Sequence, residues 1–306
     1  VDSEADRLYV AGTYVSDSQI VGDRVDKQHS VRIKILSLST LERIATIDLP
    51  GKVNEFSVQQ LQPPIAIDPV SHVVFIPNRA NSTVAVLDPT GKMLAELSVG
   101  IFPSDISVDA RNRRAFVAGL DSDNIATIDL DALKVRHSTA LGEFIGFPVV
   151  SDEYNLVAVG SSSSNWVALI DGNSGSVTTF LHPSGRPIDL EVDETLGRLY
   201  IGTESDSEEP GNLDVVSLLN SERILSASLS GVPRALRVDP AKHRVYVTSR
   251  PTRNVDVVNG TVDVFDSIDG EIIAEVEVGR NPAVMALDSS NKRVYVGNGY
   301  DVTISI

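Results

Sequence analysis

The stretch VDPAKHRVYVTS, Val238–Ser249, decides the fold, because its pattern recurs along the chain. In it an Asp stands seven positions before a Tyr that is flanked by β-branched residues. The same spacing joins five other pairs: Asp2 and Tyr9, Asp68 and Phe75, Asp109 and Phe116, Asp193 and Tyr200, and Asp288 and Tyr295. A looser seventh copy places Asp152 six positions before Ala158. Successive aromatic slots are 66, 41, 42, 42, 46 and 49 residues apart, and such a period predicts an array of similar units.

The segment Pro63–Gly100 shows what one unit contains. Turn-forming residues separate four short apolar runs, which are Ile65–Ile67, Val73–Ile76, Val84–Leu87 and Leu94–Val99. Runs of this length predict a four-stranded antiparallel meander, with no room for a helix of ordinary length. The repeated Asp is expected to fold a turn by accepting backbone hydrogen bonds, and the aromatic is expected to pack between sheets. A proline stands at or just before each first strand, namely Pro64, Pro103, Pro148, Pro187, Pro233 and Pro282.

Seven such units predict an all-β fold, a seven-bladed β-propeller of four-stranded antiparallel blades, in one domain over residues 1–306. The expected blades cover approximately residues 1–51, 63–100, 103–142, 147–182, 187–231, 233–279 and 282–306. The first and last units each have three apolar runs, so 26 strands are expected where complete blades would give 28. Because an unpaired strand edge promotes aggregation, we expect residues before Val1 or after Ile306 to complete the ring.

Two segments resemble the YVTN-repeat β-propellers of the quinoprotein amine dehydrogenase-like superfamily. They are RVYVTS, Arg244–Ser249, and FIPNRANSTVAVLD, Phe75–Asp88, and the resemblance extends over nearly the whole chain. It implies the propeller fold and a secreted, periplasmic or cell-surface location. For function it implies several possibilities, because propellers of this kind include surface proteins, amine dehydrogenase subunits, streptogramin lyases and lactonases.

Composition excludes several classes of function. The formal net charge of −16 and the pI near 4.7 argue against nucleic-acid binding, which needs clustered Lys and Arg. No stretch approaches the roughly 18 consecutive apolar residues of a transmembrane helix, so membrane insertion is not expected. The chain has no cysteine, which excludes disulfides, thiolate metal sites and cysteine nucleophiles. No cofactor is expected, and the sequence does not indicate an oligomeric state.

In a propeller, the connections from fourth to first strand and from second to third strand share one face. The longest expected loops all belong to that face, and they are Ala11–Ser30, Lys52–Gln62, Thr203–Asn212 and Ser249–Gly260. Long loops on a rigid scaffold often carry function, so ligand contact is predicted there. The first loop alternates apolar residues and is expected to form an extra hairpin. Phe56 in the second could lie across the channel mouth, although local packing is the favoured interpretation.

Three arginines flank the prolines that open successive first strands, namely Arg186, Arg234 and Arg280. If they converge at the channel mouth, they make a site for a carboxylate or phosphate bound by bidentate hydrogen bonds. The favoured alternative is that they neutralise nearby carboxylates. Phe102, Glu143 and Phe144 are candidates for the same mouth.

Acidic residues gather in the third loop, where Glu204, Asp206, Glu208 and Glu209 could hold a hard cation such as Ca²⁺. No calcium-loop spacing is present. Arg250 and Arg253 in the next loop could pair with these acids, and a salt-bridged or solvated face is the favoured interpretation. His182, in HPSGRP beside Arg186, is a weak candidate for an acid or base.

These observations favour a secreted or cell-envelope binding scaffold that holds a protein, a glycan or a small anionic ligand on its long-loop face. One alternative is a lactonase-like or lyase-like enzyme with a small anionic substrate at the channel mouth. A metal-handling envelope protein is the second alternative.

Overall fold

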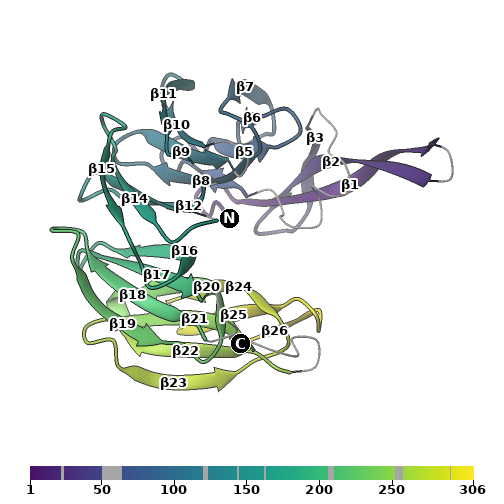
Figure 1. Ribbon diagram of the computed structural model, residues 1–306. Helices are drawn as coiled ribbons and strands as arrows, with labels where there is room; N and C mark the ends of the chain where they lie inside the picture. Colours follow the sequence, from purple (N-terminus) through teal and green to yellow (C-terminus); the bar gives the residue numbers. More distant parts are fainter. Residues whose placement is uncertain are drawn as a thin grey trace. The chain divides into compact units, whose positions relative to one another are not determined.

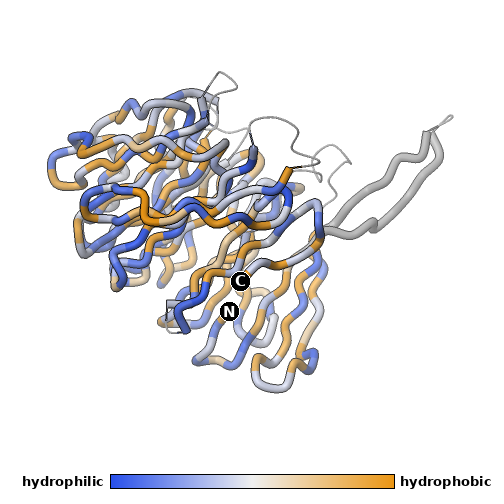
Figure 2. Tube along the Cα trace, turned by 90° about the horizontal axis from the view of Figure 1, so that it is seen from below, coloured by the Kyte–Doolittle hydropathy of each residue, from blue (hydrophilic) through white to orange (hydrophobic). Residues whose placement is uncertain are grey.

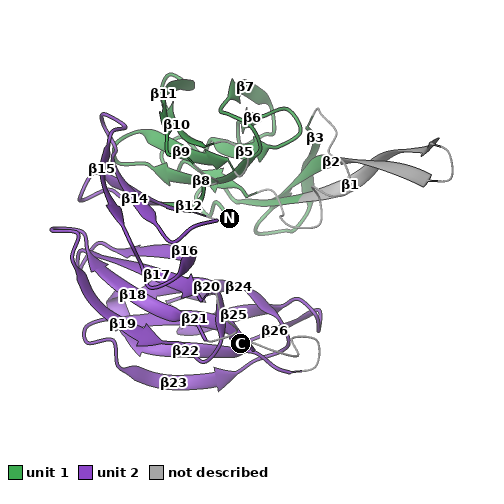
Figure 3. Ribbon diagram, in the orientation of Figure 1, with its two compact units in different colours: residues 1–148 green, residues 149–306 purple. Residues whose placement is uncertain are grey.

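The computed structural model describes residues 1–306 except 22–23, 50–63, 120–122, 143–144, 162, 206–209, 252–257 and 290, and for residues 12–30 and 147 it describes only the backbone. Its fold is the predicted one, an all-β seven-bladed propeller. By its contacts the chain forms two compact units, Val1–Pro148 and Val149–Ile306, which are described separately below (Figure 3). That all residues form one domain stays a prediction.

The sheets of the first unit follow chain order (Figure 1). The first sheet holds β1 (Arg7–Val21), β2 (Arg24–Ser37) and β3 (Arg43–Asp48). The second holds β4 (Ala66–Ile67), β5 (Val74–Asn78), β6 (Thr83–Leu87) and β7 (Met93–Ser98). The third holds β8 (Pro103–Asp109), β9 (Arg114–Gly119), β10 (Asn124–Asp129) and β11 (Lys134–Ala140). Strand β12 (Ile145–Ser151) then crosses from the first unit into the second.

The second unit repeats the same order. Strand β12 pairs in a sheet with β13 (Leu156–Ser161), β14 (Val167–Asp171) and β15 (Val177–Leu181). The next sheet holds β16 (Arg186–Asp193), β17 (Arg198–Glu204), β18 (Asn212–Ser217) and β19 (Arg223–Ser228). It is followed by β20 (Val232–Asp239), β21 (Arg244–Arg250), β22 (Thr261–Asp266) and β23 (Ile272–Glu277). The last sheet holds β24 (Pro282–Asp288), β25 (Arg293–Asn298) and β26 (Thr303–Ser305).

The described residues thus form 26 strands in sheets of three, four, four, four, four, four and three, as the sequence predicts. The extra hairpin expected in the first loop is also confirmed, as a continuation of β1 and β2 paired from Arg7 with Ser37 to Val21 with Arg24. The one helical element in the described part is the 3₁₀-helix η1 (Pro240–Lys242). The described part of the chain contains no helix of the length and apolar character that crossing a membrane requires.

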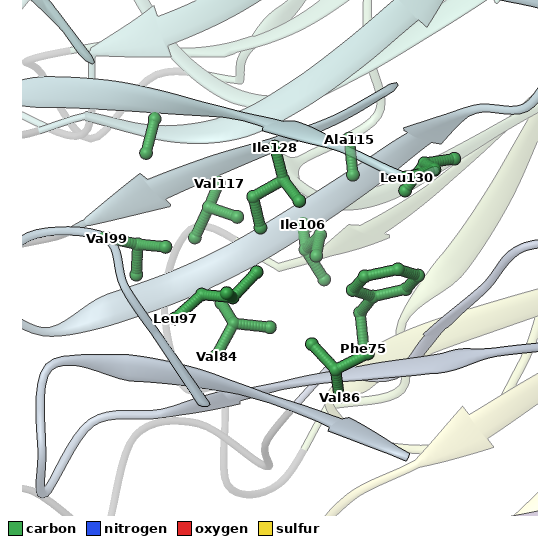
Figure 4. Close-up of a cluster of buried hydrophobic side chains, with 11 residues drawn as sticks. Phe75, Val84, Val86, Leu97, Val99, Ile106, Ala115, Val117, Ile128 and Leu130 are labelled. Carbon is green, nitrogen blue, oxygen red and sulfur yellow. The ribbon is translucent and has the colours of Figure 1, made fainter. Parts of the chain in front are cut away.

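The core lies between neighbouring sheets. Figure 4 shows Phe75, Val84 and Val86 of one sheet facing Ile106, Val117 and Ile128 of the next. Middle strands such as β6 are buried along their whole length, whereas the outer strand β11 alternates between exposed and half-buried residues. Because both of their faces are covered, the middle strands are largely apolar. In Figure 2 apolar residues accordingly follow the strands, and polar residues gather at many of the turns.

In five of its six copies the recurring Asp has the turn-folding role that the sequence predicts, and Asp239 is the exception. The carboxylate of Asp109 accepts the backbone N–H of Asn112 at 2.9 Å, and that of Asp193 accepts the backbone N–H of Thr195 at 2.9 Å. Every blade then has a left-handed residue three positions before its aromatic slot, and these are Asp6, His72, Arg113, Asn155, Gly197, His243 and Lys292. His72 and His243 are thus turn residues.

The fourth blade departs from the expected pattern. Ser151, not Asp152, occupies the turn slot seven positions before Ala158, and its hydroxyl accepts the backbone N–H of Tyr154 at 3.2 Å. The fourth blade therefore keeps the seven-residue spacing, with a serine in place of the aspartate. Pro148 is also not at the start of its strand, since it is the fourth residue of β12.

Candidate functional site

The candidate site lies in the second unit, where β16, β20 and β24 begin. These are the first strands of three successive sheets, and each is antiparallel to the strand that follows it. Arg186 therefore pairs in register with Glu204 at the end of β17, and Val232 pairs with Arg250 at the end of β21. Within this unit, the connections entering the first strands and those leaving the second strands share one end, as the sequence predicts. We call this end, defined by Arg186, Arg234, Arg250 and Arg280, the arginine end.

Two of the three predicted arginines are paired with carboxylates. Arg186 Nη2 lies 2.6 Å from Glu204 Oε2, and Arg280 Nε lies 2.6 Å from Asp301 Oδ1. The backbone N–H of Arg280 also donates to Asp301 Oδ2 at 2.7 Å. Both of these hydrogen bonds lower the pKa of Asp301. Arg186 and Arg280 thus neutralise nearby carboxylates, which is the favoured interpretation from the sequence.

Arg234 differs from the other two. Solvent reaches its side chain, and within the described residues no carboxylate lies in ion-pair distance of it and no acceptor takes a hydrogen bond from it. Burial first, and then repulsion from Arg250, lower the pKa of Arg234, while Glu204 opposes this effect. The Nε of Arg250 is itself buried with no hydrogen-bond partner in the described part of the chain. Two guanidiniums thus lie close enough to repel each other, with hydrogen-bond donors unused on both.

Further along the same strands is a cluster of three charged side chains. Arg237 Nη1 of β20 lies 2.9 Å from Glu191 Oε1 and 3.3 Å from Asp189 Oδ2, both on β16. The backbone N–H of Leu236 also donates to Asp189 Oδ2 at 2.9 Å. The two carboxylates share one cation and join the first strands of adjacent blades.

Burial is the main cause of the raised pKa values of these two acids. It raises the pKa of Glu191 to about 7, an effect that Arg237 reduces and the neighbouring Asp189 carboxylate reinforces. Burial also raises the pKa of Asp189, against the attraction of Arg237. Since solvent still reaches about a quarter of each side chain, Glu191 can exchange a proton near neutral pH.

The other predicted site residues are not brought together by the described structure. His182 is exposed, and its backbone carbonyl accepts a hydrogen bond from Arg223 Nη2 at 2.7 Å. Phe102 belongs to the first unit, where it adopts a left-handed conformation. The remaining residues lie outside the described part of the chain, and they are Phe56, Glu143, Phe144, Asp206, Glu208, Glu209 and Arg253. No group of three or more potential metal ligands occurs among the described residues.

Sequence reasoning missed Asp189, Glu191, Arg237 and Asp301. A signal for three of them is present, because charged residues occur within the first strands RPIDLEVD and VPRALRVD, where other blades have mostly apolar or small residues. In a strand, residues two apart share a face, so Asp189 and Glu191 point the same way. The partner of Asp189 is 48 residues away in the sequence, and no local pattern connects the two.

Comparison with known proteins supports the fold. No family model matches the sequence, and no curated protein matches it. Among solved structures, the chain is similar to hydrazine synthase of Kuenenia stuttgartiensis, with a TM-score of 0.68 and 18% identity over 76% of this chain and 72% of that one. It is also similar to the dihydro-heme d1 dehydrogenase NirN in complex with DHE, with a TM-score of 0.66 and 12% identity over 91% of this chain and 63% of that one. At such identities the likeness concerns the fold alone, so membership of the YVTN-repeat family stays a prediction.

Proposed function

We propose that this protein is a secreted or cell-envelope binding scaffold, and that the arginine end of its second unit holds a small anionic ligand through Arg234 and Arg250. The observation that carries the proposal is the pair of neighbouring guanidiniums with unused donors. A ligand carboxylate or phosphate would use those donors and relieve the repulsion between the two cations. The adjacent ion pairs would confine the ligand, because Arg186 and Arg280 are already engaged by Glu204 and Asp301.

Calorimetric titration of the full chain with succinate, citrate and inorganic phosphate tests this proposal. Hydrogen bonds to charged groups contribute about 1.5 to 3 kcal/mol, so Arg234→Gln is expected to weaken binding by about 10- to 150-fold. Arg250→Gln is expected to act in the same direction. Arg43→Gln is the matched control, because Arg43 is exposed in the first unit and its loss changes the net charge equally. Equal affinity in Arg234→Gln and Arg43→Gln would refute the proposal.

A second candidate function is a lactonase-like or lyase-like enzyme, and the pKa of Glu191 favours it. A carboxyl group that titrates near 7 can act as a general acid or base at neutral pH. The two solved structures similar to this chain also carry the names of enzymes. A panel of lactones and small anionic esters would test this function. Turnover that Glu191→Gln abolishes, with ligand binding at Arg234 retained, is the expected result for the enzyme.

A further inference from the structure

A pocket lies where β20 and β24 end, at the opposite end of these strands from Arg234. Its cavity volume is about 230 Å³, and Asp239, the last residue of β20, contributes to its lining. Arg234 is the third residue of the same strand, so the two sites are separated by nearly the length of β20. The other charged or hydroxyl-bearing lining residues are Lys242, Arg244, Tyr246, Lys292 and Arg293. All of them belong to the second unit.

Asp239 is the turn aspartate of its blade, yet it does not fold its turn. The residue is 3% exposed, and in the described part of the chain no donor makes a hydrogen bond to its side chain. Asp109 and Asp193 accept backbone N–H groups at the equivalent position of their blades. A proline after the Asp is not the cause, because Asp68 is followed by Pro69 and still accepts the backbone N–H of Val70 at 3.1 Å. At Asp239 the chain enters η1 directly, and the side chain of this N-cap residue makes no capping hydrogen bond. The Asp239 carboxylate therefore lines the pocket with no hydrogen bond from the described protein groups, and a ligand in the pocket can supply a donor.

The arginine that follows the turn does not compensate Asp239 either. In the third blade, Arg114 donates to Asp109 at 2.7 Å. Its counterpart Arg244 donates to the backbone carbonyl of His243 at 2.8 Å and to Asp266 Oδ2 at 3.2 Å. Asp239 therefore faces the pocket without an ion pair among the described residues.

Tyr246 adds a second unused polar group to the pocket. At the same slot of the preceding blade, the hydroxyl of Tyr200 donates to the carbonyl of Ser267 at 3.0 Å, whereas the Tyr246 hydroxyl makes no hydrogen bond within the described residues. Burial first, and then the negative charge of Asp239, raise the pKa of Tyr246. The phenol is therefore protonated at neutral pH and is available to donate.

The remaining charges of the pocket are positive. Lys242, Lys292 and Arg293 are exposed side chains that place three cations beside the single lining carboxylate, that of Asp239, whereas Arg244 is already paired with Asp266. This excess stands out in a chain whose formal net charge is −16. A complementary ligand has one cationic donor for Asp239 and more than one acidic group for the lysines and arginines.

We propose that this pocket binds a small acidic amino acid, with the α-ammonium group donating to Asp239 and the carboxylates accepting from Lys242, Lys292 and Arg293. An ammonium group has three donors and no acceptor, which suits a buried carboxylate with no other partner. The hydroxyl of Tyr246 donates to one of these carboxylates. The site is independent of the one at the arginine end and uses none of its residues.

The test compares two ligands that differ only in the ammonium group. L-glutamate and glutarate carry the same two carboxylates, and both are titrated into the full chain by calorimetry. Because the ammonium contact to Asp239 is a charge-assisted hydrogen bond, we expect glutamate to bind at least about tenfold more tightly than glutarate. Asp239→Asn is expected to weaken glutamate binding by about tenfold or more and to leave glutarate binding unchanged or tighter, since it removes a negative charge.

Matched variants separate binding in this pocket from binding elsewhere on the protein. Arg293→Gln is expected to weaken both ligands, whereas Lys134→Gln, an exposed lysine of the first unit, is expected to weaken neither. Because dicarboxylates are also the ligands proposed for the arginine end, glutamate and glutarate are compared in Arg234→Gln, which removes that site and leaves this pocket intact. Tyr246→Phe gives an independent measurement if Asp239→Asn unfolds, and it is expected to weaken binding severalfold. The proposal is wrong if neither L-glutamate nor L-aspartate binds, if glutarate binds as tightly as glutamate, or if Asp239→Asn weakens the two ligands equally.

Discussion

Arg114 and Asp109 form an ion pair from which solvent is completely excluded, with Arg114 Nη2 2.7 Å from Asp109 Oδ2 and both side chains 0% exposed. Arg114 Nε donates to the same oxygen at 2.7 Å, and its guanidinium lies 5.4 Å from the centre of the Phe116 ring. The pair thus connects the turn of its blade with the aromatic slot. Such an arrangement is stable only while both charges are present.

Removing one member of this pair is expected to destabilise the protein strongly. Arg114→Leu leaves the buried Asp109 carboxylate without its cation, which costs about 3 to 5 kcal/mol in comparable pairs. The free energy of unfolding in urea measures this loss. Arg136→Leu is the control, because its ion pair with Asp129 is partly exposed and is expected to contribute at most about 1 kcal/mol. Similar losses for the two variants would show that the buried pair of Arg114 and Asp109 is no more important for stability than a partly exposed one.

The pKa of Glu191 predicts how stability depends on pH. The carboxyl titrates at about 7 in the folded protein against a reference value of 4.5, so the folded state holds an extra proton between these values. Stability contributed by this group is therefore present below about pH 4.5 and is lost as the pH rises towards 7. Glu191→Gln is expected to stabilise the protein at pH 7 by about 1 to 3 kcal/mol relative to wild type.

Thermal unfolding between pH 5 and pH 8 checks this prediction. The wild type should lose stability more steeply than Glu191→Gln across the range. Some slope should remain in the variant, because burial also raises the pKa of Asp189. The exposed Glu275 on β23 provides the control variant Glu275→Gln, whose pH profile is expected to match the wild type. Parallel profiles for all three proteins would show that Glu191 titrates normally.

Leu41 occupies a turn position that suits glycine better. Its φ is 61° and the residue is 64% exposed, whereas the equivalent turns of three other blades hold Gly91, Gly175 and Gly270 with φ of 92°, 70° and 76°. A left-handed conformation costs an L-residue about 1 to 2 kcal/mol, and the greater freedom of glycine in the unfolded chain offsets part of the gain. Leu41→Gly is therefore expected to raise the free energy of unfolding by up to about 1 kcal/mol.

The reverse substitution supplies the comparison. Gly91→Ala is expected to destabilise, because its new Cβ would lie 2.8 Å from Ile47 Cδ1 and the backbone has a φ of +92°. Urea unfolding of both variants measures the two effects, which should have opposite signs. A loss of stability in Leu41→Gly would mean that contacts of the leucine outweigh its backbone strain.

The fourth blade offers a test of the turn slot. Ser151 is 1% exposed, and its hydroxyl accepts from the Tyr154 N–H and donates to Glu194 Oε2 at 3.0 Å. Ser151→Ala leaves buried polar groups without partners and is expected to cost about 1 to 3 kcal/mol. Asp152→Ala, one residue further along, is expected to cost less, and chemical unfolding of the two variants decides between the positions. A larger loss of stability for Asp152→Ala would show that Asp152, rather than Ser151, folds the turn.

The strands, their order and the turns could be predicted from the sequence because each depends on neighbouring residues. The Asp, the left-handed residue and the aromatic of a unit lie within eight positions of each other, so their spacing is the same in every blade, although the fourth blade has Ser151 in place of the Asp and Ala158 in place of the aromatic. Antiparallel meanders also pair each strand with the next one along the chain. The pattern of apolar runs was therefore sufficient for the fold.

Which charges are satisfied was decided only by the tertiary structure. The sequence shows that Arg186, Arg234 and Arg280 occupy similar positions, but only the folded chain pairs two of them and leaves the third beside Arg250. In the same way, Asp239 has the same spacing as Asp109, yet η1 begins directly after it, Arg244 pairs with Asp266 instead, and Asp239 has no hydrogen bond from the described residues. The energy of a charge depends on every group within a few ångströms, and residues from other strands and blades supply most of those groups.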